Sequence, residues 1–145
     1  MRLSAAYQTV LFLGLALSTA SASYPQQTSH ANQAPTEYKA TIEGLVRDIA
    51  CPIQNHKATA TDFNLECAKE CAKGGSPLII LTRSGDIYTP MSTAMPDTSQ
   101  NDKLMPFLGK FVRVRGTVYT RNGTRAITIE KIEEMKDVKL NTNAK

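Results

Sequence analysis

The stretch from residue 48 to residue 75 contains all three cysteines of the chain and one of its two histidines. These residues are Cys51, His56, Cys67 and Cys71. Thiolate and imidazole groups are the ligands that zinc prefers in proteins, and thiolates also bind Cu(I). The four residues can therefore form a tetrahedral Cys₃His site for zinc or copper, although their spacing is not one of the common zinc-finger patterns.

A disulfide is the competing interpretation of the same cysteines. Cys51 can pair with Cys67 or with Cys71, and such a bridge closes a loop of about 15–20 residues, which stabilises the fold by about 3 kcal/mol. Cys67 and Cys71 are poor partners for each other because they lie on successive turns of an expected helix. Because the number of cysteines is odd, one disulfide would leave one thiol unpaired. Redox-active thiols are a third interpretation of the same residues.

The first 22 residues have the pattern of a secretory signal peptide. Arg2 supplies the basic start, an apolar run covers residues 10–17, and small residues up to Ala22 form the cleavage site. The apolar run is shorter than the roughly 20 residues that a membrane-spanning helix needs. We therefore expect a periplasmic or secreted protein with no membrane attachment after cleavage. Cysteines in such an oxidising compartment form disulfides unless something else holds them.

Composition divides the remaining chain into three parts. Residues 23–36 are rich in Ser, Gln, Thr, Asn, Ala and Pro, which predicts a disordered leader, and residues 137–145 are expected to be a disordered tail. Residues 37–136 are of a suitable length for one domain. The net charge of +4 and the absence of Trp give no sign of a nucleic-acid-binding surface, and we expect a monomer.

Short apolar or alternating runs within this domain predict five strands. They lie at residues 38–46, 77–83, 87–89, 111–120 and 126–132. Tight turns at Ser84-Gly85-Asp86 and at Asn122-Gly123 join two of the strand pairs, and Gly44 marks a bulge or bend in the first strand. A short helix is expected at residues 102–109. This order predicts a mainly β fold, a five-stranded OB-type barrel, with a sandwich or an open α+β sheet as the alternative.

The cysteine segment is expected as an insertion between the first two strands. Residues 61–75 predict one helix, with Asp62 as its N-cap and Gly74 in the left-handed position after its last turn. Phe63, Cys67 and Cys71 have the spacing i, i+4, i+8, so both cysteines are expected to face the protein body.

Asp48 precedes the first cysteine and has two expected roles. Its carboxylate can cap the turn at the end of the first strand. Alternatively, it can accept a hydrogen bond from a ligating His56 and orient that ring.

Several of these features together resemble one group of proteins. The pattern consists of Gly44-x-x-x-Asp48-x-x-Cys51, His56, Cys67-x-x-x-Cys71, Gly74-Gly75 and Gly109-Lys110-x-Val112-x-Val114-x-Gly116-Thr117-Val118. It is similar to small exported bacterial proteins that have an OB-like barrel and no assigned activity. The resemblance covers most of residues 40–132. It implies the fold and the cysteine segment, and it implies no reaction.

A second candidate site lies along the strand at residues 111–120. Arg113, Arg115, Tyr119 and Arg121 are expected on one face, where an anion or a polysaccharide could bind, since the wall of an OB barrel is a common ligand surface. The solvated face of an antiparallel strand explains the same alternation.

No pattern in the sequence indicates catalysis. The chain has no suggestive carboxylate pair, no Ser/His/Asp arrangement, no phosphate loop and no dinucleotide fingerprint, so an enzyme is not expected. We therefore expect an exported, non-enzymatic protein that binds zinc or copper. The alternative is a disulfide-stapled OB module that binds a small ligand, an anionic polymer or a protein partner.

Overall fold

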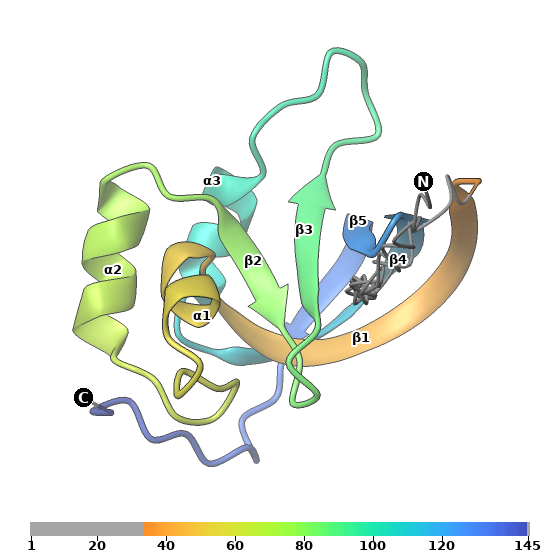
Figure 1. The fold of residues 1–145 in the computed structure, drawn as a ribbon. Coiled ribbons are helices and arrows are strands. Elements are labelled where there is room, and N and C mark those ends of the chain that lie inside the picture. The colour runs from red at the N-terminus through yellow and green to blue at the C-terminus, as the bar shows by residue number, and fades with distance from the viewer. Residues whose placement is uncertain (1–33, 145) are drawn as a thin grey trace, which may run out of the picture.

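The five predicted strands close into a barrel in the computed structural model, which describes residues 34–144 (Figure 1). The strands are β1 (Thr36–Asp48), β2 (Leu78–Leu81), β3 (Ile87–Met91), β4 (Phe111–Arg121) and β5 (Thr124–Glu134). Their order around the barrel is β1-β2-β3-β5-β4, with β3 and β5 parallel and the other neighbours antiparallel. The predicted mainly β, OB-like barrel is confirmed.

The N-terminal predictions fall largely outside the described part of the chain. The signal peptide expected at residues 1–22 lies there, as does most of the leader expected at residues 23–36. β1 begins at Thr36, one residue before the predicted start of the domain. Among residues 34–144, no helix has the length and apolar character needed to cross a membrane.

Alternation along β4 fills the interior of the barrel. Val112, Val114 and Val118 have no exposed surface, whereas Arg113 and Arg115 on the opposite face reach solvent. Such a period of two is what a strand with one buried face requires. β4 turns into β5 through an Asn-Gly pair with φ of 48° and 84°, the left-handed geometry of a tight hairpin turn. The predicted hairpin is therefore confirmed.

β1 passes from one neighbour to the next at Gly44. Gly44 pairs with Val112 of β4, and the following residue, Leu45, pairs both with Phe111 of β4 and with Leu81 of β2. A Cβ atom at position 44 would lie 2.5 Å from the carbonyl oxygen of Leu81, so only glycine permits this approach. The strand curves along its length (Figure 1). The last residues of β1 are thereby brought under the inserted segment.

A second core lies outside the barrel and covers the end of β1. Leu45, Phe63 and Phe111 are 0–2% exposed there, and they belong to one cluster with Ala60, Ile79 and Leu81. This cluster joins the outer barrel wall to the inserted segment. It explains why β1 is buried on both faces from Gly44 onward.

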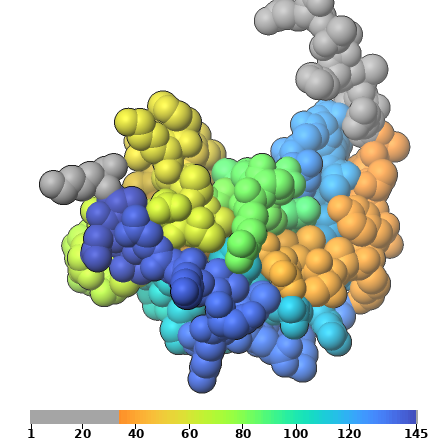
Figure 2. Space-filling model, turned by 90° about the horizontal axis from the view of Figure 1, so that it is seen from below, coloured from red at the N-terminus to blue at the C-terminus, as the bar shows by residue number. Residues whose placement is uncertain are grey.

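The C-terminal residues pack on this second core, contrary to the predicted disordered tail at residues 137–145. Val138 and Leu140 contact the cluster, and the backbone nitrogen of Phe63 donates to the carbonyl oxygen of Asn141 at 3.0 Å. Figure 2 shows these residues in dark blue against the inserted segment in yellow. The tail is mostly polar, but it contains two apolar residues that are two positions apart. In an extended chain this spacing puts both side chains on the same side.

The insertion contains two helices and not one. They are α1 (Ala50–Gln54) and α2 (Leu65–Lys73). The predicted cap is wrong, since Asn64 and not Asp62 is the N-cap of α2. The left-handed residue after α2 is Gly75, with φ of 89°, and not Gly74.

The short helix predicted between β3 and β4 is present in two pieces. They are α3 (Asn101–Leu104) and a 3₁₀ helix (Met105–Phe107). Leu104 is fully buried in the barrel core. Gly109 follows with φ of 76° and turns the chain into β4.

Candidate metal centre

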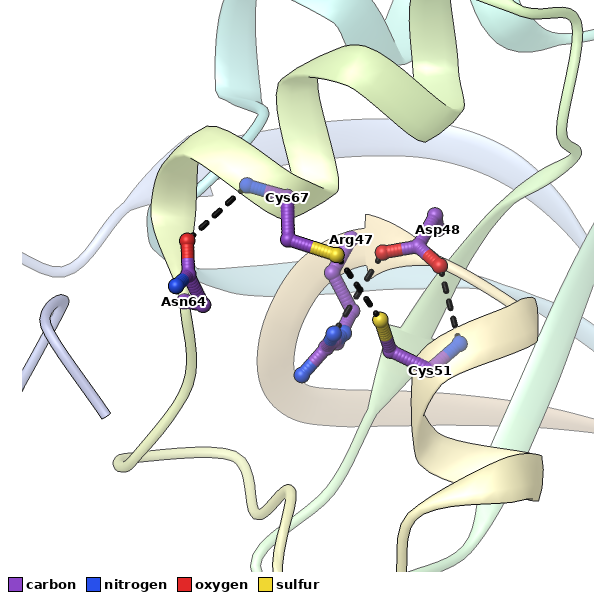
Figure 3. Close-up of polar contacts among 5 residues, drawn as sticks. All are labelled: Arg47, Asp48, Cys51, Asn64 and Cys67. Atoms are coloured by element: carbon purple, nitrogen blue, oxygen red, sulfur yellow. Dashed lines mark hydrogen bonds and ion pairs between the residues drawn. The ribbon is translucent and has the colours of Figure 1, made fainter. Parts of the chain in front are cut away.

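The sulfur atoms of Cys51, Cys67 and Cys71 all lie within 4.8 Å of one another. α1 carries the first and α2 carries the other two, and the Cys51 and Cys67 sulfurs point toward each other at 3.4 Å (Figure 3). Two thiolates bound to one zinc ion at Zn–S distances of 2.3 Å are about 3.8 Å apart. The three sulfurs therefore have a spacing that one soft metal ion can bridge with small side-chain movements.

Asp48 fixes the position of the first cysteine. Its Oδ2 accepts a hydrogen bond from the backbone nitrogen of Cys51 at 2.9 Å, and its side chain is fully buried. A carboxylate in this position satisfies a free backbone donor of the first helical turn. The structure therefore confirms the expected capping role of Asp48 and shows no hydrogen bond from His56 to it.

Asn64 fixes the position of the second cysteine. Its Oδ1 accepts a hydrogen bond from the backbone nitrogen of Cys67 at 2.9 Å (Figure 3). The cap sets the first turn of α2, and Cys71 follows one turn later on the same side of the helix.

The buried face of α2 is made by alanines and not by the cysteines. Ala68 and Ala72 are 0% and 5% exposed, whereas Cys67 is exposed and Cys71 is half-buried. The prediction that both cysteines face the protein body was therefore wrong for Cys67. Phe63 lies before the first residue of α2, so it is not part of a helical stripe with the cysteines. The small side chains of the two alanines let α2 approach β1 closely.

The three cysteines are free thiols in this structure. The 3.4 Å between the Cys51 and Cys67 sulfurs exceeds the S–S bond length of about 2.05 Å. The expected bridge from Cys51 to Cys67 or to Cys71 is therefore not formed.

The surroundings of the cluster favour protonated thiols when no cation is present. Burial raises the pKa of Cys51, and its hydrogen bond with Cys67 and the Asp48 charge raise it further, against the lowering effect of Arg47. Burial also raises the pKa of Cys71, followed by the charge of Asp48. A bound cation would offset this concentration of negative charge, because it stabilises thiolates directly.

His56 lies apart from the three sulfurs. It is exposed and lines a separate depression of about 240 Å³ with residues 58–60 and 81–85. The group of donor atoms within 4.8 Å of one another contains the three cysteines and not His56. The structure thus brings together three of the four predicted ligands.

Arg47 lies beside the cluster and was not among the predicted site residues. Arg47 is 1% exposed, its Nη2 lies 3.3 Å from Asp48 Oδ1, and its guanidinium carbon lies 5.6 Å from the centre of the Phe63 ring. Its Nε and Nη1 have no hydrogen-bond partner, and they are the only such buried side-chain atoms in residues 34–144. A buried donor without a partner costs about 1–3 kcal/mol. Side chains alternate along β1, so Arg47 lies on the same face as the buried Leu45. This alternation was the signal in the sequence for a buried arginine.

A cavity of about 190 Å³ adjoins this arginine. Arg47, Cys51, Phe63 and Cys67 form parts of its wall. The candidate metal ligands and the incompletely paired guanidinium therefore share one cavity.

The predicted arginine face lies on the outer side of β4. Arg115 and Arg121 are exposed, and Tyr119 is half-buried. Arg113 donates from Nε and Nη2 to Glu43 at 2.8 and 2.7 Å, so its charge is already balanced. This pairing leaves the face with less free positive charge than the sequence suggested.

Comparison with protein-family models, with curated proteins and with solved structures finds no match to this chain.

Proposed function

We propose that this protein is exported and binds one zinc or Cu(I) ion through the thiolates of Cys51, Cys67 and Cys71, without catalysing a reaction. The observation that supports the proposal is the convergence of the three sulfurs within 4.8 Å. Two of the sulfurs come from α2 and the third comes from α1. The buried carboxylate of Asp48 accepts from the first turn of α1, and the side-chain amide oxygen of Asn64 accepts from the first turn of α2. Thiolates are the ligands that select soft metals.

The number of ligands distinguishes the two metals. Cu(I) is satisfied by soft sulfur ligands, and three of them can surround it. Zinc takes four ligands, so with three cysteines it requires one more from water or from another molecule. Cys51 and Cys67 both line the cavity, which gives such a ligand a place beside the ion.

The compartment is part of the same proposal. The N-terminal pattern of Arg2, an apolar run and Ala22 supports export to the periplasm or beyond. Free thiols oxidise in that compartment unless they are bound, so a metal ion there would keep all three cysteines in the thiolate form.

The test begins with protein purified under reducing conditions and freed of metal. Titration with Zn²⁺ and, without oxygen, with Cu(I) is expected to give one equivalent of bound ion, and Cu(I) is expected to bind more tightly. Substituting serine for any one of the three cysteines is expected to weaken binding more than about 100-fold, because even residues that only orient a ligand contribute 10–100-fold. Binding that survives all three single substitutions would refute the proposal.

A second candidate function is favoured by the 3.4 Å between the sulfurs of Cys51 and Cys67. A small approach of these two atoms would form a disulfide, in which the two thiols give two electrons and two protons to a disulfide-exchange partner. The protein would then be a stapled OB module for a small ligand, an anionic polymer or a protein, with Cys71 as the remaining thiol. Protein isolated directly from the periplasm distinguishes the two: one titratable thiol without metal supports the disulfide, and three thiols with one equivalent of metal support the metal site.

A further inference from the structure

Arg47 is a buried cation with only part of its hydrogen-bonding capacity used. The single ion pair of its guanidinium runs from Nη2 to Asp48 at 3.3 Å, which is long for a charged pair. The other oxygen of Asp48 is occupied by the backbone nitrogen of Cys51. Nε carries one N–H group and Nη1 carries two, and no acceptor lies within reach of either. The Nε and Nη1 groups of Arg47 are therefore hydrogen-bond donors that an acceptor on a bound ligand could pair with.

The cavity at Arg47 combines this cation with apolar walls. Phe63 lies under the guanidinium, and Ala58 and Ala144 also line the space. Lys57 adds a second positive charge at the exposed rim. The cavity also contains Asp62, whose carboxylate oxygens accept from Asn141 Nδ2 at 3.1 Å and from Thr61 Oγ1 at 3.3 Å.

We propose that this cavity binds a small organic carboxylate, whose oxygens pair with Arg47 and whose apolar part lies against Phe63. Guanidinium and carboxylate groups form strong charge-assisted hydrogen bonds, and the buried position of Arg47 reduces competition from water. The apolar walls favour an organic anion over an inorganic one. The volume of about 190 Å³ is several times the ~30 Å³ of one water molecule and below the range for drug-sized ligands, so the ligand is small.

The carboxylate enters from the rim of the cavity. Nε and Nη1 have almost no contact with solvent, so an anion that reaches them must displace rim side chains. Asn55 and Lys57 are exposed and line the same cavity. Asn55 Oδ1 accepts a hydrogen bond from the backbone nitrogen of Lys57 at 3.0 Å, so the long side chain of Lys57 is the one expected to give way. This inference does not depend on the proposed metal, because neither Arg47 nor Phe63 is among the converging metal ligands.

The test uses the metal-free protein, reduced with dithiothreitol in a Tris buffer. Chelators and phosphine reductants that carry carboxylates are left out because they would compete. Propionate is titrated while the amide resonances of Cys51 and Asn64 are followed by NMR, with propionamide as the neutral isostere and sulfate as the inorganic anion. Propionate is expected to saturate these shifts with a Kd of about 1–10 mM, in keeping with its few atoms. Propionamide and sulfate are expected to bind at least about tenfold more weakly.

Two variants test the role of Arg47. Asp48→Asn removes the only charge paired with the guanidinium and is expected to tighten propionate binding. The double variant Arg47→Met/Asp48→Asn removes both charges together and is expected to weaken it about tenfold or more, since a charge-assisted hydrogen bond is lost. Arg125→Met is the matched control on a partly exposed arginine, which pairs with Asp86 far from the cavity in sequence, and it is expected to leave binding unchanged.

Three results would overturn the inference. The first is propionate shifts that do not saturate, which would mean that only water fills the cavity. The second is equal binding of propionate and propionamide, and the third is unchanged binding in the double variant. If the double variant does not fold, the comparison of Asp48→Asn with the wild-type protein decides, because unchanged or weaker binding in Asp48→Asn would equally refute the role of Arg47. Metal titration is a separate measurement, so failure of the metal proposal would leave these outcomes distinct.

Discussion

The side-chain oxygen of Asn64 accepts a hydrogen bond from the backbone nitrogen of Cys67 at 2.9 Å. The N-cap residue of α2 therefore also positions a cysteine of the candidate metal centre. A single polar contact links the stability of the helix to the geometry of the site, because α2 carries two of the three sulfurs.

Asn64→Ala is expected to lower the free energy of unfolding of the metal-free protein by about 1 kcal/mol, the usual contribution of an N-cap. Metal affinity is expected to fall as well, since the first turn of α2 would fray at Cys67. Urea unfolding and metal titration measure the two effects. Asn64→Ser is the control, because a serine hydroxyl also caps helices, and both properties should stay near the wild-type values. An unaltered metal affinity in Asn64→Ala would show that the cap does not position the cluster.

His56→Ala is expected to leave metal affinity and stoichiometry unchanged. The histidine is exposed, lies in a different depression and is outside the group of converging donors. Competition titration against a chelator of known affinity provides the measurement, with Cys71→Ser as the comparison that must lose binding. A loss above tenfold in His56→Ala would mean that the loop carrying the histidine closes on the ion and completes a Cys₃His set.

Metal affinity is expected to rise steeply with pH. Burial raises the pKa of Cys51 and of Cys71 above the ordinary value of 9.0, so both thiols hold their protons at neutral pH and a metal ion must displace them. Each displaced proton makes the apparent affinity about tenfold stronger per pH unit, so displacement from Cys51 and Cys71 alone gives at least about 100-fold per unit between pH 6 and 8. Titrations at three pH values measure the slope. A flat profile would contradict metal binding through these thiols.

Removal of residues 137–145 is expected to destabilise the fold by about 2–3 kcal/mol, because Val138 and Leu140 are partly buried on the second core and full burial of such a side chain contributes about 1.5–3 kcal/mol. Denaturant unfolding measures the change. The double variants Val138→Ser/Leu140→Ser and Lys136→Ser/Lys139→Ser separate the cause: the first should reproduce most of the loss, and the second, on exposed side chains, should not. Equal stability of the truncated and full chains would show that the tail only lies on the surface.

The barrel could be predicted from the sequence because its signals are local. Val112, Val114 and Val118 alternate with polar residues, and the Asn122-Gly123 turn requires backbone angles that these residues adopt readily. Five runs with clear turns leave few ways to arrange a small β domain. As a result, the observed strand bounds differ from the predicted ones by only a few residues.

The helical insertion was less predictable because tertiary contacts decide it. α1 is five residues long and contains Pro52, so no periodicity marks it. The phase of α2 follows Ala68 and Ala72, two small residues that any helix face tolerates, and they turn Cys67 toward Cys51 and away from the core. Arg47 was missed because its neighbours Phe63, from the insertion, and Ala144, from the tail, come together with it only in the folded chain.

The path of the C-terminal residues limits how the protein can be tagged for metal analysis. Ala144 lines the same cavity as Cys51 and Cys67, so this residue lies close to two of the thiols. A polyhistidine purification tag attached shortly after Ala144 would bring imidazole groups near the sulfur ligands and would supply zinc and copper ligands of its own. Metal analysis of such a fusion would report the tag together with the protein. An affinity handle that contains no histidine or cysteine, or one that is cleaved before titration, keeps the measurement specific to the chain itself.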